Sequence, residues 1–517
     1  MSSKISNHRL IAALVALMLP TAAYADDTDA EARIRELEKQ MQAMSQELIA
    51  VQQQLAQSKE ARVEEKGKSQ GSPVYAAFKD GITFEDGSGN WKLAINGRVQ
   101  ADYRTFSPDV DAADTYSIRR ARLGGTLTFY KDFVARVEGE YSAAAGTTLT
   151  YGYVDINKFP AAKVRLGQFK PLYGLERAMS TNFIDFQERS MADALLGSTF
   201  DRGVMVFGTP ITGINYSLAM VNGTGTSDEN NVKNDGKDTT LRLTANAAEW
   251  AGWKDAVVHI GGFYADGNQG SRRLAGVIPT GQTEGRGLQF FSTACSGGTI
   301  PALAGCPTAT ATGAATTGAF ADNVKRTRSG LETALAYGPV KLQGEFINTK
   351  FDGPGYSREI DAWYTSAVWN VTGESFASMY KEGIFGRLKP KNNYKGGGDG
   401  WGALQIGGRY SKFDASDFKT SNNPGTGVLL NPLIAPRALG LPSGAVPVAS
   451  LSDGLVTATN EADAWTVGAN WILNPNVRLV ANWVRTNYDT PVTVRVNGVN
   501  KTFDDEDAFT LRAQFDF

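Results

Sequence analysis

Apolar and polar residues alternate along much of the chain. Between Trp91 and Tyr103 the odd-numbered positions are apolar or small, while most even-numbered positions are polar or charged. The same alternation returns over residues 509–517, at the end of the sequence. A period of two indicates a β-strand with one apolar and one polar face. Strands of about ten residues with this pattern are typical of a transmembrane β-barrel.

Sixteen such segments lie between residues 91 and 517. Short turns and long loops alternate between them, and the long loops, residues 170–201, 266–326 and 414–461, all fall at the same end. A soluble β-sandwich also alternates, but it has about seven strands in roughly 100 residues. We therefore predict an all-β fold, a 16-stranded antiparallel transmembrane β-barrel. Residues 371–400 break the rule, because they form a long connection at the short-turn end, and the pattern does not explain them.

The strands are predicted to start near these positions: Trp91, Ile118, Phe133, Leu149, Lys163, Arg202, Ile214, Thr239, Ala256, Thr327, Val340, Ser357, Trp401, Ala462, Val477 and Asp507.

The amino terminus has the features of a secretory signal. Lys4 and Arg9 precede an apolar stretch, and residues 23–25 form a small-residue cleavage site. The alternative is an uncleaved anchor, but the apolar run has about ten residues where a membrane helix needs roughly 20. We predict a signal peptide over residues 1–25, which directs the chain towards the bacterial outer membrane.

Residues 26–60 follow a heptad pattern. Ile34, Leu37, Met41, Met44, Leu48, Val51 and Leu55 are spaced alternately three and four residues apart. This spacing predicts a short periplasmic α-helical coiled coil more strongly than a lone amphipathic helix, and it does not fix the number of strands. Residues 61–90 are predicted to form a linker that leads into the barrel domain, residues 91–517.

Composition excludes several kinds of chemistry. Lys and Arg number 52 against 54 Asp and Glu, so the chain lacks the cationic surplus of a nucleic-acid binder. Only 2 His and 2 Cys are present, and no catalytic motif occurs, so we predict no enzyme activity, metal or cofactor. His259 lies in an ordinary strand pattern and is interpreted as structural. Cys295 and Cys306 share one loop and are the candidates for a disulfide in an oxidising compartment.

The polar faces of the predicted strands are rich in cations. An arginine on the lipid side costs roughly 2–4 kcal/mol at mid-bilayer, so the polar face is expected to line the lumen. By this rule inward cations outnumber inward acids by about two to one, and such a lining favours anions. The alternative is that these are ordinary solvated residues paired with the acids. The inward cations include Lys92, Arg98, Arg104, Arg120, Arg122, Arg136, Lys163, Arg165, Arg242, Lys341, Arg409, Arg478 and Arg512.

Several motifs resemble the phosphate-selective porin O and P family, and they run in family order across almost all of residues 80–517. The resemblance implies a 16-stranded trimeric outer-membrane porin, with a coiled coil before the barrel in many members. It also identifies part of residues 371–400 as a family motif. The motifs are residues 117–124, 164–171, 173–177, 186–190, 370–374 and 470–478.

The resemblance further implies an arginine ladder that leads anions to a basic constriction. Arg119 and Arg120 match the family's Arg-Arg pair, although the alternation turns Arg120 inward and leaves Arg119 near the rim. The loop of about residues 170–201 matches the constriction loop, and it offers Lys170, Arg177, Arg189 and Arg202 as anion contacts. The predicted pathway residues are Arg98, Arg119, Arg120, Arg122, Arg136, Arg165, Arg242, Arg409 and Arg478.

The expected function is passive diffusion of small anions, with phosphate, pyrophosphate or polyphosphate as solutes. A general porin of low selectivity and a structural or adhesive outer-membrane barrel are the alternatives. The expected partners are the small anions, the lipid bilayer with lipopolysaccharide, and two further copies in a homotrimer. The carboxy-terminal alternation that ends at Phe517 resembles the signal read by the barrel-assembly machinery.

Overall fold

The computed structural model describes most of the chain after residue 72. The predicted signal peptide, all of the predicted coiled coil except residue 39, and both cysteines, Cys295 and Cys306, lie outside the described residues. No helix within the described part of the chain has the length and apolar character needed to cross a membrane. The described residues are 39, 73–78, 81–108, 114–142, 146–226, 236–269, 280–292, 324–353, 356–396, 398, 400–417, 454–457, 459–496 and 499–517.

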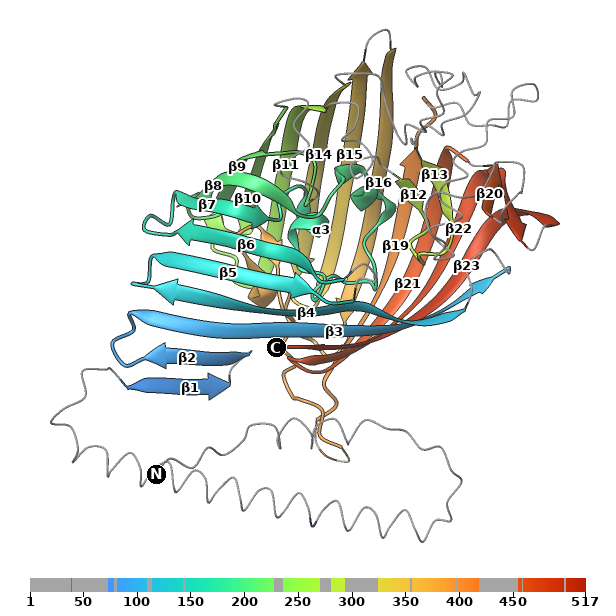
Figure 1. Cartoon of the computed structure of the whole chain (residues 1–517). Helices are drawn as coiled ribbons and strands as arrows, with labels where there is room; N and C mark the ends of the chain where they lie inside the picture. The colour runs from blue at the N-terminus through green and yellow to red at the C-terminus, as the bar shows by residue number, and fades with distance from the viewer. Residues whose placement is uncertain are drawn as a thin grey trace, which may run out of the picture. The chain divides into compact units, whose positions relative to one another are not determined.

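Sixteen antiparallel strands form a closed barrel, as predicted (Figure 1). The last strand pairs with the first, from Asp507 opposite Ser107 to Asp516 opposite Arg98, and this pairing closes the sheet. The strands are β3 (Trp91–Ser107), β4 (Thr115–Phe129), β5 (Phe133–Glu140), β6 (Thr148–Ile156), β7 (Lys163–Phe169), β8 (Asp201–Ile211), β9 (Ile214–Val221), β10 (Asp238–Asn246), β11 (Ala256–Gln269), β14 (Val324–Tyr337), β15 (Val340–Gly353), β16 (Tyr356–Asn370), β19 (Ala403–Asp414), β21 (Glu461–Asn474), β22 (Val477–Val496) and β23 (Val499–Asp516).

Short elements extend the barrel at both ends. The hairpin of β1 (Val74–Phe78) and β2 (Ile82–Asp86) lies beside the start of β3. The strand β20 (Gly454–Thr457) pairs with the far part of β22. A four-residue helix, α4 (Ala247–Trp250), forms the turn between β10 and β11, and the Asn246 side chain caps its first turn.

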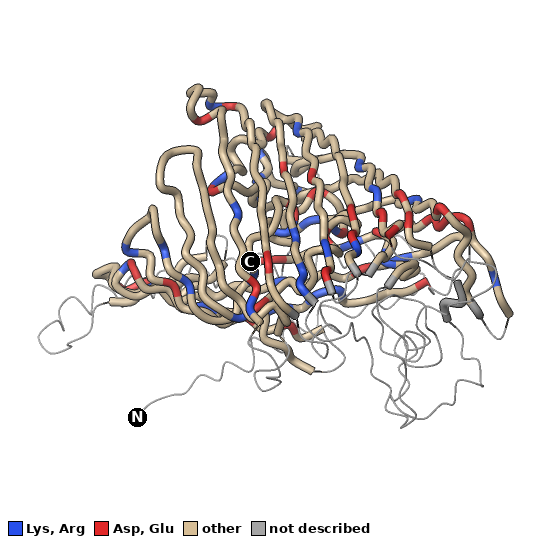
Figure 2. Tube along the Cα trace, turned by 90° about the horizontal axis from the view of Figure 1, so that it is seen from above, with Lys and Arg blue, Asp and Glu red and all other residues tan. Residues whose placement is uncertain are grey.

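The alternation of the sequence becomes the two faces of the wall. In β23, Phe509, Leu511 and Phe515 are exposed on the outside, whereas Arg512 and Gln514 are buried on the inside. A bilayer around the barrel requires an apolar outer band, and the inner face is then free to carry polar groups. Viewed from above, Figure 2 shows Lys and Arg positions interspersed with Asp and Glu positions along the strands.

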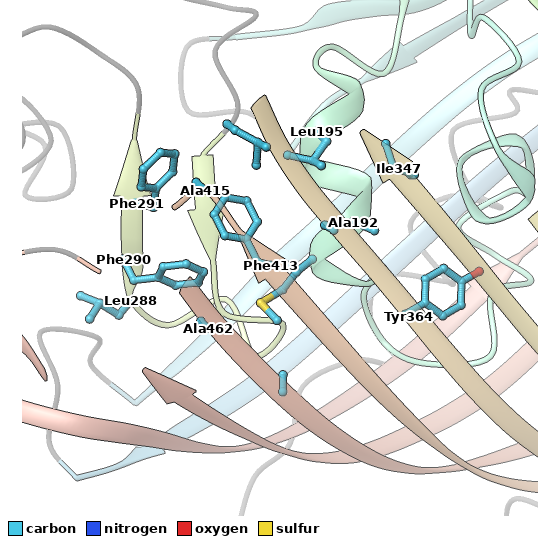
Figure 3. Packing of buried hydrophobic residues seen from close by; sticks show 14 of the residues in the cluster. Ala192, Leu195, Leu288, Phe290, Phe291, Ile347, Tyr364, Phe413, Ala415 and Ala462 are labelled. Atoms are coloured by element: carbon cyan, nitrogen blue, oxygen red, sulfur yellow. The ribbon is translucent and has the colours of Figure 1, made fainter. Parts of the chain in front are cut away.

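Two connections at the long-loop end fold into the lumen. The first, residues 170–200, carries α3 (Leu175–Ala178) and the 3-10 helix η2 (Met191–Leu196). The second carries the hairpin of β12 (Thr280–Gln282) and β13 (Gln289–Ser292). Phe290 of this hairpin meets the ring of Phe413 edge to face, with 5.5 Å between the ring centres (Figure 3). Leu195 of η2 belongs to the same apolar cluster, so the inner wall anchors both loops.

Residues 376–385, in the middle of the connection 371–400, fold into the lumen from the opposite end. They contain the 3-10 helix η4 (Ala377–Met379) and the two-residue strands β17 (Tyr380–Lys381) and β18 (Ile384–Phe385). Phe376 and Phe385 join an apolar cluster with Leu175 of the constriction loop. The connection that the strand pattern left unexplained, hereafter the inner segment, thus meets the constriction loop inside the barrel.

Candidate functional site

The carboxylate of Glu188, on the constriction loop, lies at the centre of an arginine cluster. Arg119 donates to both of its oxygens, with Nε 2.9 Å from Oε1 and Nη2 3.3 Å from Oε2. Nη2 of Arg512 lies 2.7 Å from Oε1. The nearest guanidinium nitrogens of Arg104 and Arg120 lie 3.5 and 3.6 Å from the carboxylate. The loop is therefore held against β3, β4 and β23 by charge.

A β-bulge in β4 turns both members of the Arg-Arg pair towards Glu188. Arg120 lies opposite Gln100, but Ile118 lies opposite the next residue, Ala101, so Arg119 is the extra residue of the strand. A bulge commonly redirects a side chain at a functional site. It explains why strict alternation left Arg119 near the rim, although its side chain reaches the lumen.

A second carboxylate fixes the more deeply buried arginines. Asp102 accepts hydrogen bonds from Nε and Nη2 of Arg512, at 2.7 and 2.8 Å, and from Nη2 of Arg104 at 2.6 Å. Arg120 donates to Gln100 at 2.8 Å. Only Arg119, whose side chain is 25% exposed, keeps substantial access to the lumen among these four arginines.

The tip of the β12–β13 hairpin adds a fifth arginine. Arg286 is exposed and lies close enough to Arg119 and Glu188 to interact with them electrostatically. The side chain is open to solvent on one side but enclosed by the lumen wall on the other; this partial loss of water, together with repulsion by Arg119, lowers the pKa of Arg286 to about 10, so it remains positive at neutral pH. We call Arg104, Arg119, Arg120, Arg286 and Arg512, with Glu188 and Asp102, the central cluster.

The central cluster carries a positive surplus. Burial would raise the pKa of Glu188, but Arg119, Arg120 and Arg512 outweigh this effect and hold it well below the usual range. Glu188 is therefore ionised at neutral pH. Five guanidinium groups face two carboxylates, which leaves three uncompensated positive charges within the described cluster.

Each of the other predicted arginines of the β3–β7 wall lies near an acid, although Arg98 and Arg136 share Glu138. Arg122 lies 2.7 Å from Glu140, and Arg136 lies 2.7 Å from Glu138. Arg98 lies 3.9 Å from Glu138 and donates to Thr181 of the constriction loop.

Arg165 donates hydrogen bonds to both carboxylate oxygens of Asp155, at 2.7 and 2.8 Å, and its guanidinium lies 3.8 Å from the ring centre of Tyr153. These contacts hold each charge in a fixed place on the wall, where four arginines face three carboxylates.

Three predicted arginines on the far wall anchor the segments inside the barrel. Arg242 binds Glu332 at 2.8 Å and donates to the Gly383 carbonyl of the inner segment at 3.0 Å. Arg478 donates to the Ile184 carbonyl at 3.0 Å.

Arg409 bridges the two loops that enter from the long-loop end. It contacts Glu176 of the constriction loop at 3.0 Å and Glu284 of the β12–β13 connection at 2.6 Å. Ser411 and Thr466 also donate to Glu284, at 2.6 Å each. The bridge fixes both loops against β19 and β21.

The cations of the constriction loop mostly bind the loop's own backbone. Lys170 Nζ donates to the carbonyls of Ala178 and Met179, at 2.8 and 2.9 Å, and burial together with nearby arginines lowers its pKa well below the usual value.

Arg177 and Arg189 lie 2.5 and 3.7 Å from Asp193, and each also donates to backbone carbonyls. Arg202 donates to Gln168 and to the Thr226 carbonyl. Their role as anion contacts stays a prediction, and their hydrogen bonds favour a part in holding the loop.

Periodicity singled out some residues of the central cluster and missed others. Arg104 and Arg512 occupy inward positions of the alternating pattern, but only their partners Asp102 and Glu188 bring them to the centre. Arg286 stands in an irregular connection, where no periodic signal exists to find it.

His259, which the sequence pattern placed in an ordinary strand, bridges wall and inner segment. Its Nδ1 lies 2.7 Å from the Tyr380 hydroxyl, and its Nε2 lies 3.3 Å from Glu332. The pair of contacts ties β11 and β14 to the inner segment.

Two comparisons with known sequences find relatives of this chain. Residues 93–278 and 303–517 match the sequence profile described as phosphate-selective porin O and P. Porin O of Pseudomonas aeruginosa is 25% identical over 467 residues, which cover 86% of this chain and 93% of that protein.

Solved structures with a similar fold include two proteins of the outer membrane. OmpT of Vibrio cholerae, expressed in the outer membrane, has a TM-score of 0.46 at 10% identity and covers 83% of this chain and 98% of its own. The outer membrane channel DcaP of Acinetobacter baumannii has a TM-score of 0.43 at 12% identity and covers 84% and 99%. With the profile matched over most of its length, the chain belongs to the phosphate-selective porin O and P family.

Proposed function

We propose that this porin conducts small anions across the outer membrane, with phosphate, pyrophosphate or polyphosphate as its solutes. The observation that carries the proposal is the surplus of three positive charges in the central cluster. Arg119 and Arg286 are the two members that keep access to the lumen, so they are the groups that an arriving anion meets first.

Competition with Glu188 makes the binding reversible. A phosphate oxygen that approaches Arg119 must share a guanidinium that already donates to Glu188 at 2.9 Å. The carboxylate keeps the arginines aligned when no solute is present, and it limits how tightly the solute is held. Conduction requires this balance, since a site that binds too strongly does not release its ion.

The outer face and the sequence support the expected partners. Apolar side chains such as Leu331 and Leu335 face outward on β14, where lipid and lipopolysaccharide would contact them. The heptads of residues 34–55 are consistent with a homotrimer, and the final strand, ending at Phe517, offers the signal for the barrel-assembly machinery. Signal peptide cleavage and the coiled coil are part of the same proposal.

A general porin of low selectivity is the second candidate. The observation that favours it is the pairing of the wall arginines, because Arg165 with Asp155 and Arg242 with Glu332 contribute little net charge. Selectivity then depends on the central cluster alone.

Reversal potentials in a planar bilayer under a KCl gradient test the proposal. We expect an anion-selective potential, a chloride current that low concentrations of phosphate block, and a loss of both effects in the Arg119→Gln, Arg286→Gln double variant. A cation-selective or neutral wild-type channel would overturn the proposed anion preference and favour the general porin. A barrel that inserts without any conductance would favour the structural role.

A further inference from the structure

The tip of the β12–β13 hairpin, residues 283–288, holds Arg286 in an unusual backbone conformation. The main-chain N–H of Arg286 donates to the Thr283 carbonyl at 2.8 Å, and that of Gly287 donates to the Thr283 hydroxyl at 3.0 Å. Arg286 has a φ of +63°, in the left-handed region that residues with a side chain rarely adopt. Such a conformation persists only where surrounding contacts hold it, so the contacts of the tip decide where Arg286 stands.

Glu284 anchors one side of the tip. Besides its contact with Arg409, it accepts from the Thr466 hydroxyl at 2.6 Å and from the main-chain N–H of Met191 at 3.2 Å. These contacts attach the part of the tip that precedes Arg286 to β19, to β21 and to the constriction loop. The part that follows Arg286 is supported from another strand.

That support is the buried carboxylate of Glu506, on β23. Its Oε2 accepts a hydrogen bond from the main-chain N–H of Leu288 at 2.8 Å. The side chain of Leu288 belongs to the same apolar cluster as Phe290 (Figure 3). Loss of the carboxylate would leave a buried N–H group without its acceptor, which is costly. Glu506 therefore fixes the main chain two residues after Arg286.

Two glycines let the tip approach β23 closely. A methyl group at Gly287 would overlap both carboxylate oxygens of Glu506, and one at Gly285 would overlap Ala508. Glycine is the residue that permits such close approach of a backbone. Arg286 stands between these two glycines, and its own side chain is exposed and interacts with the central cluster.

We propose that Glu506 is the positioning residue for Arg286. It acts through the main chain of Leu288 and does not itself meet the solute. The strand β23 then contributes to the central cluster twice, directly through Arg512 and indirectly through Glu506. This role rests on the proposed function, in which Arg286 is one of the groups that an arriving anion meets first.

Phosphate block of the chloride current in the full-length channel tests the proposal. Glu506→Met removes the acceptor and keeps an unbranched side chain of similar length. It should raise the half-blocking concentration of phosphate about threefold, as should Arg286→Gln, because a charge-assisted contact is lost in both. Glu506→Gln keeps an acceptor oxygen and should stay close to the wild type. Asp504→Asn, which changes an exposed acid of the same strand, is the matched control and should leave the block unchanged.

A double variant separates positioning from a general loss of structure. If Glu506 acts through Arg286, Glu506→Met should add no further loss of phosphate block to Arg286→Gln. Gly287→Ala should behave like Glu506→Met, because the added methyl group breaks the same contact with Leu288. Conductance in 1 M KCl should stay at the wild-type value in all of these variants, which controls for the width of the channel.

Hydrogen–deuterium exchange reports the position of the tip without reference to the solute. The peptide that contains Leu288 should exchange about tenfold faster in Glu506→Met than in the wild type, and at nearly the wild-type rate in Glu506→Gln. A wild-type channel that phosphate does not block would refute the proposed solute. The exchange rate and the chloride-to-potassium permeability ratio would then test the positioning of Arg286 in place of the block.

Three results would overturn the proposal. The first is unchanged phosphate block in a Glu506→Met channel of normal conductance, and the second is an additive loss when this change is combined with Arg286→Gln. The third is unchanged exchange at Leu288, which would show that the hydrogen bond does not hold the tip. If Glu506→Met fails to insert, Gly287→Ala takes its place, and wild-type block in that variant would refute the role of Glu506.

Discussion

Arginine side chains have different roles in the central cluster and in the wall of β5–β7. At the centre, five arginines share Glu188 and Asp102. On the wall, Arg165 holds both oxygens of Asp155 for itself. The difference lies in the ratio of acids to arginines, because a surplus attracts mobile anions whereas a matched pair mainly fixes the wall.

Removal of one carboxylate from each region is expected to show the largest difference between the central cluster and the wall. Glu188→Gln takes away the competitor of an incoming anion and should lower the half-blocking concentration of phosphate about tenfold, equivalent to about 1.4 kcal/mol. Asp155→Asn removes the same charge from the wall and should lower it no more than about twofold. Titration of phosphate against chloride current measures both.

Equal shifts in the two variants would show that only the total charge of the lumen matters. A variant that loses the loop contact altogether would instead show larger conductance with no phosphate block, so conductance in KCl alone must be recorded as the control for loop position.

Removal of an exposed arginine is expected to have a smaller effect, on the chloride-to-potassium permeability ratio. Arg119→Gln should lower the chloride-to-potassium permeability ratio about threefold, because the exposed guanidinium of the cluster is lost. The double variant Arg165→Gln, Asp155→Asn removes a matched pair and should leave the ratio unchanged. Reversal potentials under a KCl gradient give the ratio, and a matching fall in the double variant would contradict the assignment of selectivity to the centre.

The barrel could be predicted from the sequence because the bilayer imposes its pattern. The alternation gave the first residues of β3, β5 and β7 as Trp91, Phe133 and Lys163, which the structure confirms. Lipid requires an apolar outer face at every second position, so this information is local. The inward parity of Arg120 and Arg512 could be predicted for the same reason.

The contents of the lumen could not be predicted in this way. The bulge at Arg119 depends on how two strands pair, and Arg286 arrives from an irregular loop. The inner segment is held in place by contacts such as the one between Tyr380 and His259, two residues that are 121 positions apart in the chain. Periodicity carries no information about such long-range contacts.

The third prediction concerns pH and the attachment of the constriction loop. Burial would raise the pKa of Asp193, but Arg177 and Arg189 lower it, and the pKa of Glu188 is held still further down. A carboxylate whose pKa is lower in the folded than in the unfolded state stabilises the folded state at pH values above its unfolded pKa of about 4. This contribution is lost as the pH falls through the pKa of the folded state. The loop should therefore stay attached from pH 7 to about pH 4.5.

Glu176 is an acid of the loop whose pKa is shifted in the opposite direction from that of Glu188. Burial raises its pKa, although Arg409 opposes the shift. Arg409 keeps its contact with Glu284, so protonation of Glu176 should not release the loop. Single-channel conductance recorded at decreasing pH tests this expectation, and a wider channel already at pH 5 would contradict it.

The smallest expected effect comes from the junction between wall and inner segment. Tyr380→Phe removes the hydroxyl that lies 2.7 Å from Nδ1 of His259 and should loosen the inner segment by about 1 kcal/mol, the scale of one hydrogen bond. Trypsin should then cleave after the exposed Lys381 a few times faster in the folded channel. Tyr394→Phe, at an exposed position of the same connection, is the matched control and should not change the rate.

The Arg242 contact to the Gly383 carbonyl remains in both variants, so the chloride-to-potassium permeability ratio should stay at its wild-type value. A change in that ratio in Tyr380→Phe would show that selectivity extends to the inner segment and is not confined to the central cluster.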